Sequence, residues 1–107
     1  MVGAGAYDAT KGGLRLLTRT LALEVAEDRI TVNNLAPGMI LTPMNQEALE
    51  DPAKRKEQTQ HIPWKRAGRP EEVAKLAIYL ASTDADYVTG ASFFIDGGLR
   101  MMMGQGA

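Results

Sequence analysis

The stretch "GRPEEVAKLAIYLASTDADYVTGASFFIDGG", residues 68–98, decides the fold class. Pro70 suits the first position of a helix, and the two glutamates that follow it favour the positively polarised N-terminal end. Apolar residues then recur at helical spacing on one face, at Val73, Leu76, Ala77 and Leu80. After a turn, the short apolar run Ser92–Ile95 ends before a double glycine. The stretch predicts a helix, a turn and a strand.

A second strand is predicted upstream, in "RITVNNLAPG", residues 29–38. The run Ile30–Leu35 is rich in β-branched residues and stops at Pro37 and Gly38. The segment 44–60 between this strand and the next helix is polar, and Pro52 interrupts any single helix there. Since it offers little to anchor to a core, we expect a mobile lid or a plain solvated connection.

Residues 6–27 predict a long helix. One apolar face carries Leu14, Leu17, Leu21 and Val25. A second stripe nearly opposite, Leu16 and Leu23, either meets another helix, such as one of a partner subunit, or is ordinary surface leucine. The chain order is then helix, strand, lid, helix, strand. A strand, a helical crossover and a second strand form one right-handed parallel unit, so the fold class is α/β. Parallel sheets usually have more than two strands and covered faces, so this chain resembles half of a larger fold.

Composition limits the function classes. The 107 residues allow at most one domain, and a net charge of −1 gives no case for binding nucleic acid or anionic membranes. The chain has no cysteine and one histidine, His61, so we expect no disulfide and no metal site. No apolar run approaches the ~20 residues of a membrane span, and the N-terminus lacks the features of a signal peptide. We expect a cytoplasmic protein.

Two possible motifs lie near the N-terminus. "GAGAYD", residues 3–8, matches only two glycines of a dinucleotide fingerprint and follows no strand, so we reject that interpretation. Tyr7 and Lys11 share one helix face. An unperturbed tyrosine has a pKa of about 10, and a nearby cation favours the phenolate, so the pair suits proton exchange with an alcohol or ketone. Taken alone, the pair is more simply interpreted as part of a solvated helix face.

The motifs along the rest of the chain favour a catalytic role for this pair. The chain resembles the short-chain dehydrogenase/reductase family over Tyr7–Gly98, through Tyr-x-x-x-Lys on a helix, "VNNLAPG", Thr42, "GRPEEVA", "YVTG" and "DGG" in that order. The resemblance implies the C-terminal part of a doubly wound Rossmann fold, with the last two parallel strands and their flanking helices, incomplete as given. Residues 1–107 would form one such incomplete domain, with residues 44–63 as the substrate loop.

The resemblance also implies roles for individual residues. Tyr7 would be the general acid/base, and Lys11 would hold the nicotinamide ribose and lower the pKa of Tyr7. The cofactor, NAD or NADP, would also meet the residues that follow the first strand: Pro37, Gly38, Ile40 and Thr42. The backbone at Pro37 and Gly38 would approach the nicotinamide. Ile40 would meet its carboxamide, and Thr42 the carboxamide or a nearby phosphate. Asn33 and Asn34 would serve structural hydrogen bonds.

Within the family, "LTPMN" and "IPWKRAGRPEEVAKLAIYLAS" resemble glucose 1-dehydrogenase-type enzymes, which act on an alcohol or sugar. The alternative is a 3-oxoacyl-carrier-protein reductase. The family's glycine loop, helical asparagine and catalytic serine all precede the tyrosine helix, and only six residues precede Tyr7 here. We therefore expect the 107 residues alone to be inactive. We also expect a homo-oligomer, most simply a tetramer, or a second chain that supplies the missing half. A last alternative is an inert oligomerising fragment.

Overall fold

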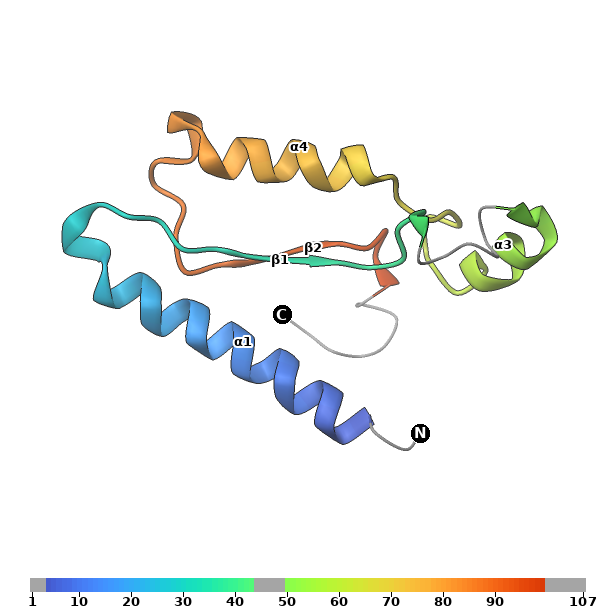
Figure 1. Cartoon of the computed structure of the whole chain (residues 1–107), viewed down its shortest axis with the longest axis horizontal. Helices are drawn as coiled ribbons and strands as arrows, with labels where there is room; N and C mark the ends of the chain where they lie inside the picture. The colour runs from blue at the N-terminus through green and yellow to red at the C-terminus, as the bar shows by residue number, and fades with distance from the viewer. Residues whose placement is uncertain (1–3, 44–49, 100–107) are drawn as a thin grey trace. The chain divides into compact units, whose positions relative to one another are not determined.

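The computed structural model describes residues 4–43 and 50–99, with side chains from residue 9 onward. In chain order the elements are α1 (Ala4–Glu24), the short 3-10 helix η1 (Ala26–Asp28), β1 (Asn34–Pro37), α3 (Pro52–Thr59), α4 (Pro70–Ala81), the 3-10 helix η3 (Thr83–Ala85) and β2 (Ser92–Ile95) (Figure 1). The chain divides into two compact units. The first comprises Met1–Leu35 and Leu80–Phe93, and the second comprises Ala36–Tyr79 and Phe94–Ala107.

The predicted N-terminal helix is confirmed as α1. It ends at Glu24, and the chain then tightens into η1. Arg29 ends this turn in a left-handed conformation, with φ of 59°, and its N–H donates to the carbonyl of Ala26. A side chain with a Cβ rarely adopts that conformation inside a helix, so the helix cannot continue through Arg29.

The buried face of α1 is not the leucine face. Thr18 and Ala22, one turn apart, are buried, whereas Leu14, Leu17 and Leu21 of the predicted apolar face are 45%, 52% and 38% exposed. The second stripe, Leu16 and Leu23, is 61% and 79% exposed. A Cβ placed on Gly90 would lie 3.5 Å from the Cβ of Ala22, which is ordinary van der Waals contact. The small side chain of Ala22 therefore lets the helix approach the backbone at Gly90 closely. The hydroxyl of Thr18 is satisfied by the carbonyl of Leu14, at 2.8 Å.

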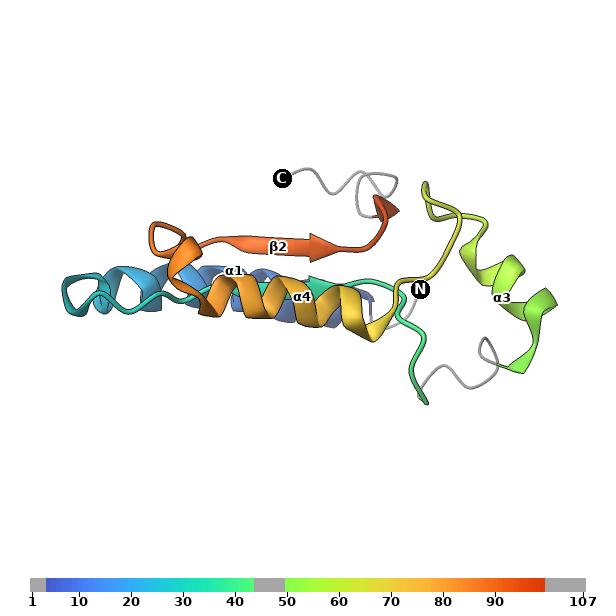
Figure 2. The same cartoon turned by 90° about the horizontal axis from the view of Figure 1, so that it is seen from above.

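The two strands form one parallel sheet, and their arrows point the same way (Figure 2). Asn34 N–H donates to the carbonyl of Ala91, and Gly38 N–H donates to that of Ile95, both at 2.9 Å. The offset between the paired residues is the same at both ends, as it is in a parallel ladder. The predicted second strand, Ser92–Ile95, is confirmed as β2.

The prediction for the first strand was partly wrong, because β1 begins at Asn34 and not at Ile30. A turn that includes Thr89 and Gly90 lies opposite residues 30–33. Val32 N–H donates to the hydroxyl of Thr89 at 2.9 Å, and Gly90, with φ of 75°, donates to the carbonyl of Val32 at 2.7 Å. A turn that bonds through a side chain and a left-handed glycine does not continue the ladder, so the strand starts only where β2 begins.

The two asparagines before and within β1 make structural hydrogen bonds, as predicted. Asn33 Nδ2 donates to the carbonyl of Val88 at 3.0 Å, and Asn33 Oδ1 accepts from the N–H of Ala91 at 3.2 Å. Asn34 Nδ2 donates to the hydroxyl of Ser92 at 3.3 Å. Asn33 thus ties the turn before β2 to the start of β1.

The second unit carries α3 and all of α4 except its last two residues. α3 begins at Pro52, where the sequence predicted only a lid or a solvated connection, and Asp51 Oδ1 caps it by accepting from the N–H of Ala53 at 2.9 Å. α4 begins at Pro70, and its predicted apolar face is half-buried: Val73, Leu76, Ala77 and Leu80. Residues 44–49 of the predicted lid lie outside the described residues, and the lid over 44–63 stays a prediction.

Candidate functional site

Tyr7 and Lys11 both belong to α1, one helical turn apart. Their backbones therefore lie on the same face of the helix, as the sequence spacing predicts. The Lys11 side chain is exposed, and the side chain of Tyr7 lies outside the described residues. Both residues belong to the first compact unit. The helix gives this pair a fixed spacing along its axis.

The other predicted site residues lie in the second unit. Pro37 is the last residue of β1, and Gly38, Ile40 and Thr42 follow it. Past the end of β1 the backbone forms a parallel bridge between Ile40 and Gly68. Leu41 N–H donates to the carbonyl of Gly68 at 3.0 Å, and Gly68 N–H donates to that of Met39 at 2.9 Å. Ile40 is buried and Thr42 is half-buried. The bridge holds this segment extended beyond the sheet.

Gly38 is required by close packing against the end of β2. A Cβ at Gly38 would lie 2.7 Å from the Cβ of Asp96 and 3.0 Å from its Cα, closer than real side chains come. Asp96 in turn accepts a hydrogen bond from Gly98 N–H at 3.0 Å, and both Gly97 and Gly98 have positive φ, 63° and 90°. The "DGG" turn and the Pro37-Gly38 step therefore fit together through backbone that only glycine can provide.

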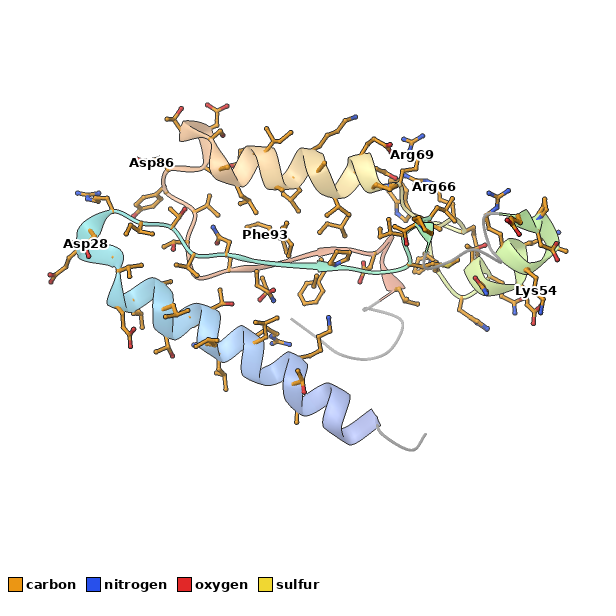
Figure 3. All side chains as sticks on the ribbon, in the orientation of Figure 1. Asp28, Lys54, Arg66, Arg69, Asp86 and Phe93 are labelled. Carbon is orange, nitrogen blue, oxygen red and sulfur yellow. The ribbon has the colours of Figure 1, made fainter. Side chains whose placement is uncertain are left out.

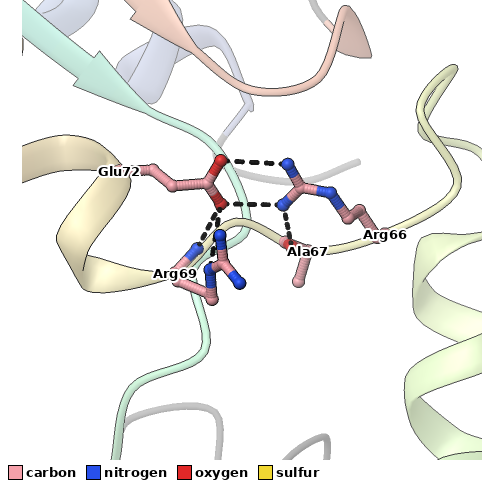
Figure 4. Close-up of polar contacts among 4 residues, drawn as sticks. All are labelled: Arg66, Ala67, Arg69 and Glu72. Atoms are coloured by element: carbon pink, nitrogen blue, oxygen red, sulfur yellow. Dashed lines mark hydrogen bonds and ion pairs between the residues drawn. The ribbon is translucent and has the colours of Figure 1, made fainter.

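An ion pair stands at the start of α4, and the sequence interpretation missed it. Both carboxylate oxygens of Glu72 accept from the guanidinium of Arg66, at 2.7 and 2.9 Å (Figure 4). The same carboxylate accepts from the backbone N–H of Arg69 at 3.0 Å, which caps the helix. Arg66 and then the Arg69 N–H lower the pKa of Glu72 to about 2. The sequence shows a glutamate at the third position of the helix. It does not show that the side chain of Arg66, which precedes the helix, folds back to reach this glutamate.

A cavity of about 340 Å³ lies between the "DGG" turn and the start of α4. Its lining includes Trp64, Phe94 and Asp96. Trp64 N–H donates to the carbonyl of Gly97 at 3.2 Å, and the guanidinium carbon of Arg66 lies 5.9 Å from the centre of the Trp64 ring. The cavity is therefore partly aromatic, with one charged rim formed by the Arg66–Glu72 pair.

Among residues 4–43 and 50–99, no three His, Cys, Asp or Glu side chains group closely enough to hold a metal ion. In the same part of the chain, no helix combines the length and the apolar character needed to cross a membrane.

Comparison with known proteins identifies the family. A family model described as enoyl-(acyl carrier protein) reductase matches residues 1–100. The chain is 47% identical over 98 residues to 3beta-hydroxysteroid dehydrogenase 1 of Eggerthella lenta, and 44% identical over 99 residues to glucose 1-dehydrogenase 2 of Bacillus subtilis. Each match covers 92% of this chain and 38% of the relative.

Solved structures agree. The active-site complex of Pseudomonas aeruginosa RhlG with NADP superposes with a TM-score of 0.82 at 42% identity, over 88% of this chain and 38% of that one. The chain thus spans well under half the length of the proteins it matches, and the α/β arrangement with parallel strands is that of part of their Rossmann fold. The chain belongs to the short-chain dehydrogenase/reductase family.

Proposed function

We propose that the protein is an NAD(P)-dependent oxidoreductase that exchanges a hydride between nicotinamide and an alcohol or ketone. The observation that carries the proposal is the Tyr7–Lys11 pair on one face of α1, in a chain of this family. The Eggerthella lenta and Bacillus subtilis relatives are dehydrogenases, and the related RhlG structure is a complex with NADP. The nicotinamide, when bound, would supply the hydride donor or acceptor.

In this proposal Tyr7 handles the proton. For oxidation, the Tyr7 phenolate removes the hydroxyl proton of the alcohol as the C–H bond gives up its hydride, and for reduction the neutral phenol returns that proton to the forming alkoxide. The ammonium group of Lys11 stabilises the phenolate, because a cation close to an acid favours its charged form. Lys11 would also donate hydrogen bonds to the nicotinamide ribose.

The segment after β1 would hold the nicotinamide. The parallel bridge to Gly68 fixes the Ile40 backbone in an extended conformation, which suits contact with a planar carboxamide. The backbone at Gly38 would approach the nicotinamide, while the space that a Cβ would fill there is taken by Asp96. Thr42 offers a half-buried hydroxyl to the carboxamide or to a nearby phosphate. Pro37 is the last residue of β1, so the segment that would hold the nicotinamide begins at the end of the strand.

For the substrate we propose a sugar, oxidised as in a glucose 1-dehydrogenase. The 44% identity to glucose 1-dehydrogenase 2 supports this choice. A second candidate is the reduction of a 3-oxoacyl thioester, favoured by a family model whose description names an acyl-carrier-protein reductase. Residues 44–63 would close over either substrate.

Assembly and location complete the proposal. We propose a homo-oligomer in the cytoplasm, most simply a tetramer. The exposed leucines of α1, 61% and 79% at Leu16 and Leu23, offer apolar surface that needs a cover. A neighbouring subunit or another part of the protein would bury them.

Turnover of the natural protein tests the proposal. Glucose is offered with NAD and with NADP, and acetoacetyl thioester with NADH and with NADPH, while absorbance of the reduced nicotinamide is followed. We expect turnover with one pair at ~1 s⁻¹ or faster. Activity with the thioester but not with glucose would overturn the sugar as substrate and favour the second candidate, the reduction of a 3-oxoacyl thioester. Failure to bind any nicotinamide nucleotide at about 1 mM, where even a weak specific site would be half filled, would overturn the enzyme proposal and favour an inert oligomerising protein.

A further inference from the structure

Five basic side chains line a cavity of about 480 Å³ in the second unit. The cavity lies between α3 and the segment that leads into α4. Arg55 and Lys56 line it from α3, and Lys65, Arg66 and Arg69 line it from the other side. Arg66 and Arg69 lie together at the start of α4 (Figure 3). The volume is in the range that accepts a small organic ligand.

The charges of this pocket are not balanced by its own lining. Among the described residues that line it, none is an aspartate or glutamate. Glu72 neutralises part of one side, with its carboxylate 2.7 Å from Arg66 and 3.8 Å from Arg69. On the α3 side, Arg55 and Lys56 make no ion pair with any described residue. Like charges brought together repel each other, and an anion between them would relieve that repulsion.

Neighbouring groups hold two of the cations in place. The bidentate pair with Glu72 fixes the plane of the Arg66 guanidinium, and Arg66 Nη1 also donates to the carbonyl of Ala67 at 3.1 Å. Lys65 Nζ donates to the carbonyl of Gln60 at 2.6 Å. A guanidinium has five N–H groups and an ammonium has three, so both cations keep donors for a ligand. A cation already oriented loses less conformational entropy when a ligand arrives.

We propose that this pocket binds a phosphorylated small molecule, through charge-assisted hydrogen bonds from α3 on one side and from residues 65–69 on the other. Phosphate is favoured over carboxylate because a phosphate ester carries a charge of about −1.5 to −2 and three acceptor oxygens, whereas a carboxylate carries one charge and two oxygens. Cations on both sides of a cavity match the greater charge. The site does not depend on the redox activity proposed above.

Calorimetric titration of the natural protein with pyrophosphate at low salt tests the site. We expect a Kd of about 1 mM or tighter. The double variant Arg55→Gln/Lys56→Gln should weaken binding about tenfold or more, because it removes two charge-assisted contacts. The matched control is Lys54→Gln. Lys54 lies on the same helix and carries the same charge, but it does not line the pocket, so we expect a change of about twofold or less.

A second variant separates a loss of charge from a loss of fold. Arg55→Lys/Lys56→Arg keeps both charges and should retain pyrophosphate binding within about threefold. The proposal is overturned if pyrophosphate does not bind at ~10 mM, or if Lys54→Gln weakens binding as much as the double glutamine variant does. The phosphate assignment is wrong if succinate, a dicarboxylate, binds as tightly as pyrophosphate and responds in the same way to the double variant.

Discussion

Both carboxylate oxygens of Glu72 accept hydrogen bonds from the guanidinium of Arg66, at 2.7 and 2.9 Å. This contact is the main cause of the low pKa of Glu72, about 2 against an ordinary 4.5. In the unfolded chain the carboxyl would titrate near its ordinary value. The pair therefore contributes stability in full above pH 4.5, and the contribution is lost as the pH falls through about 2.

Carboxyl titration followed by NMR checks this prediction. We expect the Arg66→Met variant to raise the pKa of Glu72 towards its ordinary value. Arg69→Met is the control. Its side chain lies farther away, at 3.8 Å, and its backbone N–H remains, so the pKa should rise much less. A Glu72 that titrates near 4.5 in the unmodified protein would contradict the account.

Gly38→Ala should destabilise the protein by about 1–3 kcal/mol, because the new methyl group meets the Cα and Cβ of Asp96 and neither can move without shifting β2. Gly12→Ala is the matched control. It lies inside α1, and nothing described lies within 4 Å of its added methyl group. There we expect a gain of ~0.5–1 kcal/mol from helix propensity. Urea unfolding of the natural protein and both variants measures the difference, and equal effects at the two glycines would contradict the packing described here.

Asn33→Ala should cost about 1–3 kcal/mol, because it leaves the carbonyl of Val88 and the N–H of Ala91 without their partner. Asn34→Ala removes one longer hydrogen bond, at 3.3 Å, and should cost about 0.5–1 kcal/mol. Thermal unfolding of the two variants gives the comparison. A larger loss at Asn34 than at Asn33 would show that the turn before β2 is held in another way.

Lys11→Met should weaken the use of the nicotinamide nucleotide. Loss of one charge-assisted donor is expected to raise KM for the cofactor about tenfold or more and to lower kcat as well. Lys75→Met provides the control, since Lys75 is an exposed lysine on α4. Steady-state kinetics with varied cofactor checks the prediction. An unchanged cofactor KM and kcat in Lys11→Met would remove Lys11 from the proposed site.

Local chemistry made much of this fold predictable. Pro70 and the glutamates after it marked the start of α4, and the apolar run before Gly97 marked β2. The first strand was placed too early because β-branched residues at 30–32 favour a strand, but what lies opposite them is the turn at Thr89 and Gly90. A strand needs a partner, and a single stretch of sequence does not show one.

The packing face of α1 was harder to predict for a related reason. The hydrophobic periodicity predicts that the leucines are buried, whereas the buried positions are Thr18 and Ala22, whose side chains are smaller.

The basic pocket could not be predicted from the sequence for another reason. Its cations come from two separate segments, at 55–56 and 65–69, and each alone resembles a solvated charge run. Tyr7 and Lys11 could be singled out because their four-residue spacing has a direct meaning on a helix.

The Tyr7→Phe variant tests the central claim most directly. Its turnover, in whichever nicotinamide-dependent reaction the natural protein performs, is compared with that of Tyr87→Phe, the same substitution at a fully exposed tyrosine. The account predicts that Tyr7→Phe loses about 10²–10⁴-fold in kcat, with an unchanged unfolding transition, and that Tyr87→Phe keeps full activity. A Tyr7→Phe protein that retains turnover within about threefold of the natural protein would contradict the role of Tyr7 as the proton donor and acceptor.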